Sequence, residues 1–115
     1  MQTTELATPV TGNADATLAE IVRRIASVEP RARIILFGSR ARGDARPDSD
    51  YDLVIIAPWL DPDRSPSGHI RRALRGIDAA MDLLVLTPED WNRGLKLYGS
   101  VVQDVARQGL VLYGG

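Results

Sequence analysis

The chain has 115 residues, a length that fits one domain with a real core but not a second folding unit. Its 14 basic and 15 acidic residues nearly cancel, which argues against a general affinity for nucleic acid or for an anionic membrane. No apolar run is long enough to span a bilayer, and residues 1–13 lack the basic start and apolar core of a signal peptide. The absence of cysteine excludes disulfides and thiolate metal sites, and it fits a cytoplasmic location.

The first part of the chain predicts an arm, a helix and a strand. Residues 1–13 carry Thr, Pro and Gly with little apolar content, which is typical of a flexible arm, and the domain is expected at 14–115. One buried helix face is indicated by apolar residues spaced at i, i+3, i+4 and i+7, namely Leu18, Ile21, Val22 and Ile25. Pro30 should end this helix, and the β-branched and aromatic run 34–37 predicts a buried strand.

The middle of the chain predicts two more strands and a helix. Residues 39–43 are compatible with a short helix, and 50–57 predict the second strand. The proline-rich stretch 59–68 is expected to be a loop, followed by a helix over about 69–80. The continuous Leu and Val content of 82–86 predicts a third strand that is buried on both faces.

The end of the chain predicts two helices and a brief strand. Thr87 and Pro88 form a helix start, with Thr as the cap and Pro at the first position. The last helix is expected at 98–108, and residues 110–113 would make a short edge strand. Because helices must cover apolar strands, the order of elements predicts a layered α+β domain around one small sheet.

A Gly-Ser pair follows the first predicted strand. Gly38 lets the backbone turn sharply and approach a ligand without a Cβ in the way, and Ser39 offers its hydroxyl. The amides that follow would point outward at a helix N-terminus, where anions are favoured, with Arg40 and Arg42 within reach. Gly-Ser pairs also occur in ordinary strand-to-helix turns, so the pair alone leaves both interpretations open.

Two carboxylates open the second predicted strand. Asp50 and Asp52 lie at i and i+2, so on a strand they project from the same face. Such carboxylates repel one another unless a cation sits between them, and hard divalent ions such as Mg²⁺ take oxygen ligands of this kind. The alternative is a pair of solvated acids beside a turn. It is less favoured because the pair leads into a buried strand, where unpaired charge is costly.

Asp82 is the candidate for a third acid, because it opens the third strand in an apolar setting. If that strand adjoins the second, its carboxylate completes a two-metal site, in which ions ~3.5–4 Å apart stabilise the attacking and leaving oxygens of a displacement. The simpler alternative is that Asp82 caps the loop after the preceding helix. Asp78 is a rival, but helical phase keeps it before the strand, so Asp82 is preferred.

With these residues in place, the chain resembles the minimal nucleotidyltransferases of the DNA polymerase beta superfamily. The resemblance is carried by the blocks Gly38-Ser39-Arg40-Ala41-Arg42-Gly43 and Ser49-Asp50-Tyr51-Asp52-Leu53, and by Asp82-Leu83-Leu84-Val85. It implies a polymerase-beta-like fold with a small mixed sheet of three core strands, a possible short edge strand and flanking helices. It also implies ATP as nucleotide donor and two Mg²⁺ ions. The implied catalytic and metal-binding residues are Asp50, Asp52 and Asp82, and the implied phosphate-binding residues are Gly38, Ser39, Arg40 and Arg42.

The resemblance further implies a partner. Many similar proteins are the antitoxin of a two-gene system whose toxin is a helical HEPN ribonuclease, and they attach AMP to a tyrosine hydroxyl of that toxin. The chain is too short for an acceptor-binding domain, so the acceptor is expected from another chain or from a second copy of this one. Two alternatives stay open: a module that neutralises a toxin by covering it, and a transferase for a small molecule held by a separate subunit. No nucleic-acid or membrane partner is expected.

Overall fold

The computed structural model describes residues 15–114, so the predicted arm at 1–13 lies outside the described residues. Within this part, the sheet has four strands in the order β3-β2-β1-β4. Their bounds are β1 (Arg33–Phe37), β2 (Tyr51–Ile56), β3 (Met81–Leu86) and β4 (Leu110–Tyr113). β1 pairs antiparallel with β2 and with β4, whereas β2 and β3 are parallel. This confirms the layered α+β class, the mixed sheet and the edge strand at the end of the chain.

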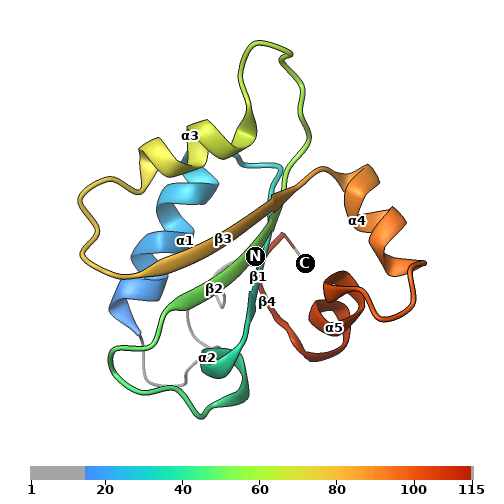
Figure 1. The fold of residues 1–115 in the computed structure, drawn as a ribbon. Helices are drawn as coiled ribbons and strands as arrows, with labels where there is room; N and C mark the ends of the chain where they lie inside the picture. The colour runs from blue at the N-terminus through green and yellow to red at the C-terminus, as the bar shows by residue number, and fades with distance from the viewer. Residues whose placement is uncertain (1–14, 115) are drawn as a thin grey trace.

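The described residues form five helices, which lie on both faces of the sheet (Figure 1). Their bounds are α1 (Ala16–Val28), α2 (Ser39–Arg42), α3 (Pro66–Ala73), α4 (Pro88–Leu95) and α5 (Val101–Gln108). α1 and α3 cover one face and α4 and α5 the other, while the single turn of α2 follows β1 at one end of the sheet. In the described part of the chain, no helix is both long and apolar enough to cross a membrane.

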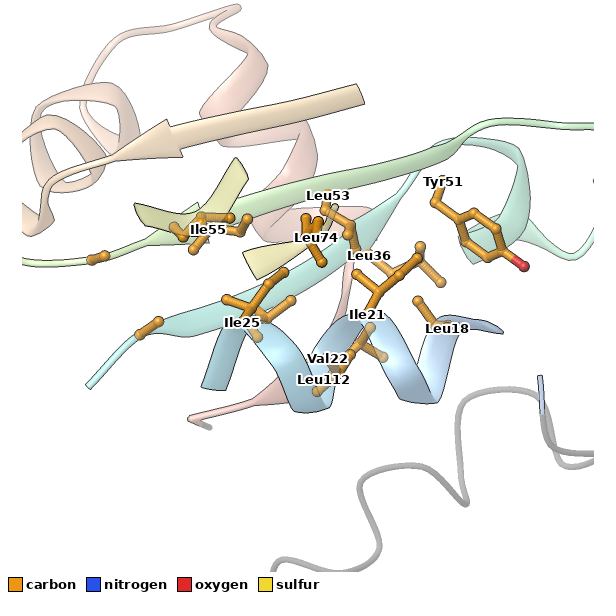
Figure 2. Packing of buried hydrophobic residues seen from close by; sticks show 14 residues of the cluster. Leu18, Ile21, Val22, Ile25, Leu36, Tyr51, Leu53, Ile55, Leu74 and Leu112 are labelled. Atoms are coloured by element: carbon orange, nitrogen blue, oxygen red, sulfur yellow. The ribbon is translucent and has the colours of Figure 1, made fainter. Parts of the chain in front are cut away.

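Two apolar cores result from the alternation of side chains along the central strands. The core on the α1 side takes Ile34, Leu36, Leu53 and Ile55 from β1 and β2. The core on the α4 side takes Ile35, Val54 and Ile56 from the same strands, together with Trp91 of α4. Figure 2 shows the first core, with the side chains of α1 packed against those of the two strands. The same alternation directs Tyr51 to the α1 side and Asp52 to the α4 side of the sheet.

The first predicted helix is confirmed, together with its buried face. Leu18, Ile21, Val22 and Ile25 are all buried in α1. The helix begins after Asp15, whose side chain accepts a hydrogen bond from the Leu18 amide at 3.0 Å. It ends at Val28, just before Pro30, because proline disfavours helical conformation in the residue ahead of it.

The helix expected at about 69–80 is displaced: α3 spans Pro66–Ala73. It begins earlier because Ser65 caps it, accepting a hydrogen bond from the Ser67 amide, with Pro66 at the start. It ends earlier because the chain leaves helical conformation before Gly76, whose φ is +88°. The Ser-Pro start is the same signal that predicted α4 correctly at Thr87 and Pro88.

The third strand was expected to be buried on both faces, and this is confirmed only in part: both faces of the strand pack on apolar cores, but no residue of β3 is fully buried. β3 lies at the edge of the sheet, beside β2 only, and its residues are partly or fully exposed. Five of the six residues of β2 are buried, so the central position belongs to that strand. The continuous Leu and Val content of β3 lets the strand pack against the helices on both faces of the sheet. It does not determine whether the strand has a neighbouring strand on each edge, and β3 has only β2.

Candidate active site

Asp52 and Asp82 are brought together by the pairing of β2 with β3. The two residues are direct partners in a parallel register. They lie two residues before Val54 and Leu84, whose side chains pack in the core on the α4 side, so both carboxylates project from that same side of the sheet. Asp50 precedes β2 and is exposed. The structure therefore places Asp82 beside the second strand, as the sequence analysis required for a third acid.

Gly38 lies against the carboxylate of Asp52. Phe37, the last residue of β1, pairs with Asp52 on β2, and the backbone then turns at Gly38 with φ 76° and ψ −156°. A Cβ built on Gly38 would be 2.2 Å from Oδ2 of Asp52, which no real contact allows. The absence of a side chain here is what lets the turn and the carboxylate lie side by side.

The charge of Asp52 is perturbed by its surroundings. Burial raises the pKa of its carboxyl group, and the negative charges of Asp82 and Asp50 raise this pKa further. The positive charge of Arg42 opposes the effect and lowers the pKa of Asp52. The three acids thus repel one another, and Arg42 is the nearby cation that partly compensates. A carboxylate perturbed by burial and by specific charges is typical of a functional site.

An open hollow of about 350 Å³ lies next to the Gly38 turn. It is lined by Phe37, Gly38, Arg42, Val101, Asp104, Val105 and Gln108. One wall is therefore α5, which the sequence analysis did not assign to the site. Its residues Val101, Asp104 and Gln108 are spaced at i, i+3 and i+7, so the sequence indicates that they share one face of the last helix. The sequence does not indicate that this face lies beside the Gly38 turn.

Ser39 and Arg42 stay close to this turn, but in different ways. Ser39 begins α2, which is a single turn of four residues. Because so short a helix sums few peptide dipoles, its dipole would attract an anion only weakly. An anion would be bound here mainly by the Ser39 hydroxyl and the backbone amides of the turn. The guanidinium of Arg42 is 3.4 Å from the carboxylate of Asp44, in an exposed ion pair. Such a pair contributes little to stability, so this side chain is available to a ligand.

Arg40 is not brought together with the other predicted site residues. Its guanidinium lies over the ring of Tyr51, with its carbon 4.0 Å from the ring centroid. Tyr51 belongs to the core on the α1 side, whereas the neighbouring Asp52 faces the α4 side. Arg40 also lines a different hollow from the one that contains Gly38 and Arg42.

The donor set fits Mg²⁺ in its chemistry. Carboxylate oxygens are the ligands that this ion prefers, and it commonly takes one or two of them and completes its shell with waters and phosphates. The repulsion that raises the pKa of Asp52 is what a bound cation relieves. Across residues 15–114, no three His, Cys, Asp or Glu side chains are gathered into a preformed metal cluster. The arrangement therefore offers a pair of acids with a third nearby, rather than a closed cage.

The mixed sheet, the paired acids and the glycine turn define a class of enzyme that transfers nucleotides. The sequence profile of the nucleotidyltransferase domain matches residues 16–109, and the chain belongs to this family.

Two solved structures share the fold. One is from Sulfolobus solfataricus and is named as a candidate nucleotidyltransferase; it is 24% identical with a TM-score of 0.54, over 93% of this chain and 82% of that one. The other is a toxin-antitoxin structure with AMP-PNP, 25% identical with a TM-score of 0.56, over 84% of this chain and 73% of that one. Among curated proteins, none matches the chain.

Proposed function

We propose that this protein is a Mg²⁺-dependent nucleotidyltransferase that moves AMP from ATP onto a tyrosine hydroxyl of a helical, HEPN-type toxin, for which it is the antitoxin. The observation that carries the transferase activity is the in-register pair Asp52 and Asp82 beside the Gly38 turn. The likeness to a toxin-antitoxin structure with AMP-PNP supports ATP as donor and a toxin as partner.

The proposed reaction exchanges one bond to phosphorus for another. The acceptor hydroxyl oxygen bonds to the α-phosphorus, the bond from this phosphorus to the oxygen that bridges to the β-phosphate breaks, and pyrophosphate leaves. Mg²⁺, when held by Asp50, Asp52 and Asp82, supplies positive charge against the triphosphate and the leaving group. The proton of the acceptor hydroxyl passes to the Asp82 carboxylate.

The remaining residues position the donor. The backbone at Gly38 and the Ser39 hydroxyl would hold the β- or γ-phosphate, and Arg42 would pair with its charge. The hollow between this turn and α5 would give the nucleotide room next to Gly38, which lies against the Asp52 carboxylate. Positioning of this kind is the main contribution that a protein makes to phosphoryl transfer.

A second candidate function is neutralisation of the toxin by binding alone. The turn between α4 and α5 exposes Leu97 at 63% and Tyr98 at 96%, and Val101, the first residue of α5 and part of the wall of the hollow, is 50% exposed. An exposed apolar group of this kind favours contact with another protein. Occlusion and transfer can therefore use the same face of the molecule, and only an activity measurement separates them.

The test is transfer of label from ATP in the presence of Mg²⁺ and an extract of cells that carry the partner. Label on the α-phosphate should move to a protein of the partner's size, whereas label on the γ-phosphate should not, because pyrophosphate is released. Asp50→Asn should abolish this transfer. Asp78→Asn is the matched control, since this exposed acid lines the hollow on the opposite, Tyr51 side, and it should transfer label as the parent does.

Two results would contradict the proposal. Equal transfer by Asp50→Asn and the parent would remove the metal role of the acids. Equal protection of cells by the two proteins, with no label transferred by either, would instead favour occlusion.

A further inference from the structure

The Arg40 side chain is fully engaged by its own protein. Its Nε and one terminal nitrogen donate to the Ser49 carbonyl oxygen at 3.1 and 2.8 Å, and the same terminal nitrogen donates to that of Pro47 at 3.2 Å. Its guanidinium stacks over the ring of Tyr51, and its other terminal nitrogen is 3.8 Å from a carboxylate oxygen of Asp15. Only 16% of the side chain is exposed. The group therefore joins α2 to the loop that precedes β2.

Tyr51 anchors this arrangement to two other elements. Its hydroxyl donates to the Asp15 carboxylate, at 2.8 Å to one oxygen and 3.0 Å to the other, and Asp15 also caps α1. Its amide donates to the carbonyl oxygen of Ala80, next to the start of β3, at 2.9 Å. Figure 2 shows the Tyr51 hydroxyl at the edge of the core, pointing away from the apolar side chains.

The loop held by Arg40 leads directly into the acids. Ser49, which receives two of the hydrogen bonds, is the residue before Asp50. Tyr51, the stacking partner, lies between Asp50 and Asp52 on the chain. Restraining the backbone at Ser49 and the side chain at Tyr51 therefore restrains the backbone that carries both carboxylates, from the opposite side of the sheet.

We propose that Arg40 is a positioning residue, which clamps the 46–49 loop through Tyr51 and Asp15 and so fixes Asp50 and Asp52, and that it does not contact the triphosphate. The expected effect of Arg40 on nucleotide transfer rests on the proposed function, whereas the clamp itself rests only on the contacts described above.

Arginine is the one side chain that can make all of these contacts. Its planar guanidinium stacks on an aromatic face while its edges donate to two carbonyl groups. A lysine in the same place keeps the charge but is a compact ammonium with neither a flat face nor a fork. A charge-conserving substitution therefore separates the clamp from a simple electrostatic contact with phosphate.

The first measurement uses the protein without ATP or Mg²⁺. Arg40→Gln, Arg40→Lys and the parent are compared by hydrogen exchange at the amides of residues 43–50. Both Arg40 variants should exchange at least about tenfold faster there, because the loop loses its charge-assisted hydrogen bonds. Arg46→Gln is the matched control: it removes the same charge from the exposed side of the same loop, and it should leave the exchange unchanged.

The second measurement separates kcat from KM for ATP, with Mg²⁺ present. Displaced acids should lower kcat by about 10- to 100-fold in both Arg40 variants while KM for ATP stays within about threefold of the parent. Lysine should not rescue the activity. The Arg46→Gln control should retain both kinetic parameters.

Other results would overturn the clamp. Arg40 would instead be a phosphate ligand if Arg40→Gln raised KM for ATP by about tenfold or more while kcat and loop exchange stayed as in the parent. In that case Arg40→Lys should restore the KM of the parent. If the parent itself transfers no label, the proposed function fails, and the exchange measurement alone decides the clamp. If Arg40→Gln does not fold, Arg40→Lys alone decides: it keeps the charge but removes the flat face and the fork, and unchanged loop exchange in this variant would refute the clamp.

Discussion

Replacing Gly38 with alanine should both destabilise the protein and strongly reduce the proposed nucleotide transfer, because a Cβ at this position has no free space. The added carbon would lie 2.2 Å from Oδ2 and 3.1 Å from the carboxyl carbon of Asp52, well inside the ordinary contact distance of 3.4 Å or more. The backbone adds a second cost, since φ 76° with ψ −156° is a conformation that other residues rarely adopt.

The magnitude of the effect follows from these two costs. Backbone strain contributes about 1–3 kcal/mol, and displacing a packed side chain contributes about 1–3 kcal/mol. The free energy of unfolding should therefore fall by about 2–6 kcal/mol, which lowers the Tm of a domain of this size by at least about 8 °C. A shift of about 1 Å in Asp52 should also reduce transfer about 100-fold.

The assay pairs thermal unfolding with transfer of α-labelled AMP, and Gly76→Ala is the matched control. Gly76 also has a positive φ, +88°, but a Cβ there has nothing within 4 Å. Its substitution should cost only the backbone term, about 1–2 kcal/mol, with transfer per folded molecule unchanged. If Gly38→Ala lowers Tm no more than Gly76→Ala and still transfers label, the contact of the turn with Asp52 is irrelevant to the site.

Three further predictions concern the acids and the α4–α5 pair. Burial and the charges of Asp82 and Asp50 raise the pKa of Asp52, so the folded protein holds this proton more tightly than the unfolded one and loses stability as pH rises through the folded-state pKa. Asp52→Asn should therefore raise Tm at pH 7 without metal by about 2–5 °C after screening by solvent, and melts below pH 3.8, the ordinary carboxyl value, should show no gain. In calorimetry, Mg²⁺ at ten times its Kd should stabilise the parent by about 1.4 kcal/mol and stabilise Asp52→Asn less; equal stabilisation would place the ion elsewhere. Gly94→Ala should lower the free energy of unfolding in urea by about 1–3 kcal/mol, because a Cβ on Gly94 would be 2.5 Å from Val102 of α5, and an unchanged urea midpoint would contradict this.

Local signals in the sequence were sufficient for most of the helices and strands. The apolar spacing of Leu18 to Ile25 and the Thr87-Pro88 start each describe a property of one segment, and each is confirmed by the fold. The boundaries of α3 were missed although the same kind of signal was present at Ser65 and Pro66, because the apolar stripe was followed beyond Gly76. The error therefore arose from giving the apolar spacing more weight than the Ser-Pro helix start and the glycine.

The position of a strand within the sheet is a different kind of information. The apolar runs of β2 and β3 are alike in composition, yet β2 is central and β3 is at an edge. Which strand gains two neighbours depends on how the whole chain is routed, and in particular on β4 pairing with β1 instead of with β3. No window of sequence around β3 contains that information.

The path of a long side chain is equally hard to predict from spacing. The sequence places Arg40 and Arg42 two residues apart and equally near the glycine turn. In the fold, Arg42 acts on the charge of Asp52, whereas Arg40 turns to Tyr51 on the other side of the sheet. The difference depends on a ring and a carboxylate, Tyr51 and Asp15, that belong to no phosphate-binding motif.

The alignment of the acids is a consequence of how the cores pack. Asp52 and Asp82 are partners in the same register that pairs Leu53 with Leu83 and Val54 with Leu84. A slip of one residue between β2 and β3 would send Asp82 to the α1 side and would also turn every apolar side chain of β3 toward the wrong core. The apolar pairs therefore fix the alignment of the two carboxylates without contacting them. A substitution that weakens either core but keeps the register should lower stability and leave transfer per folded molecule intact, whereas one that permits slippage should lose both together.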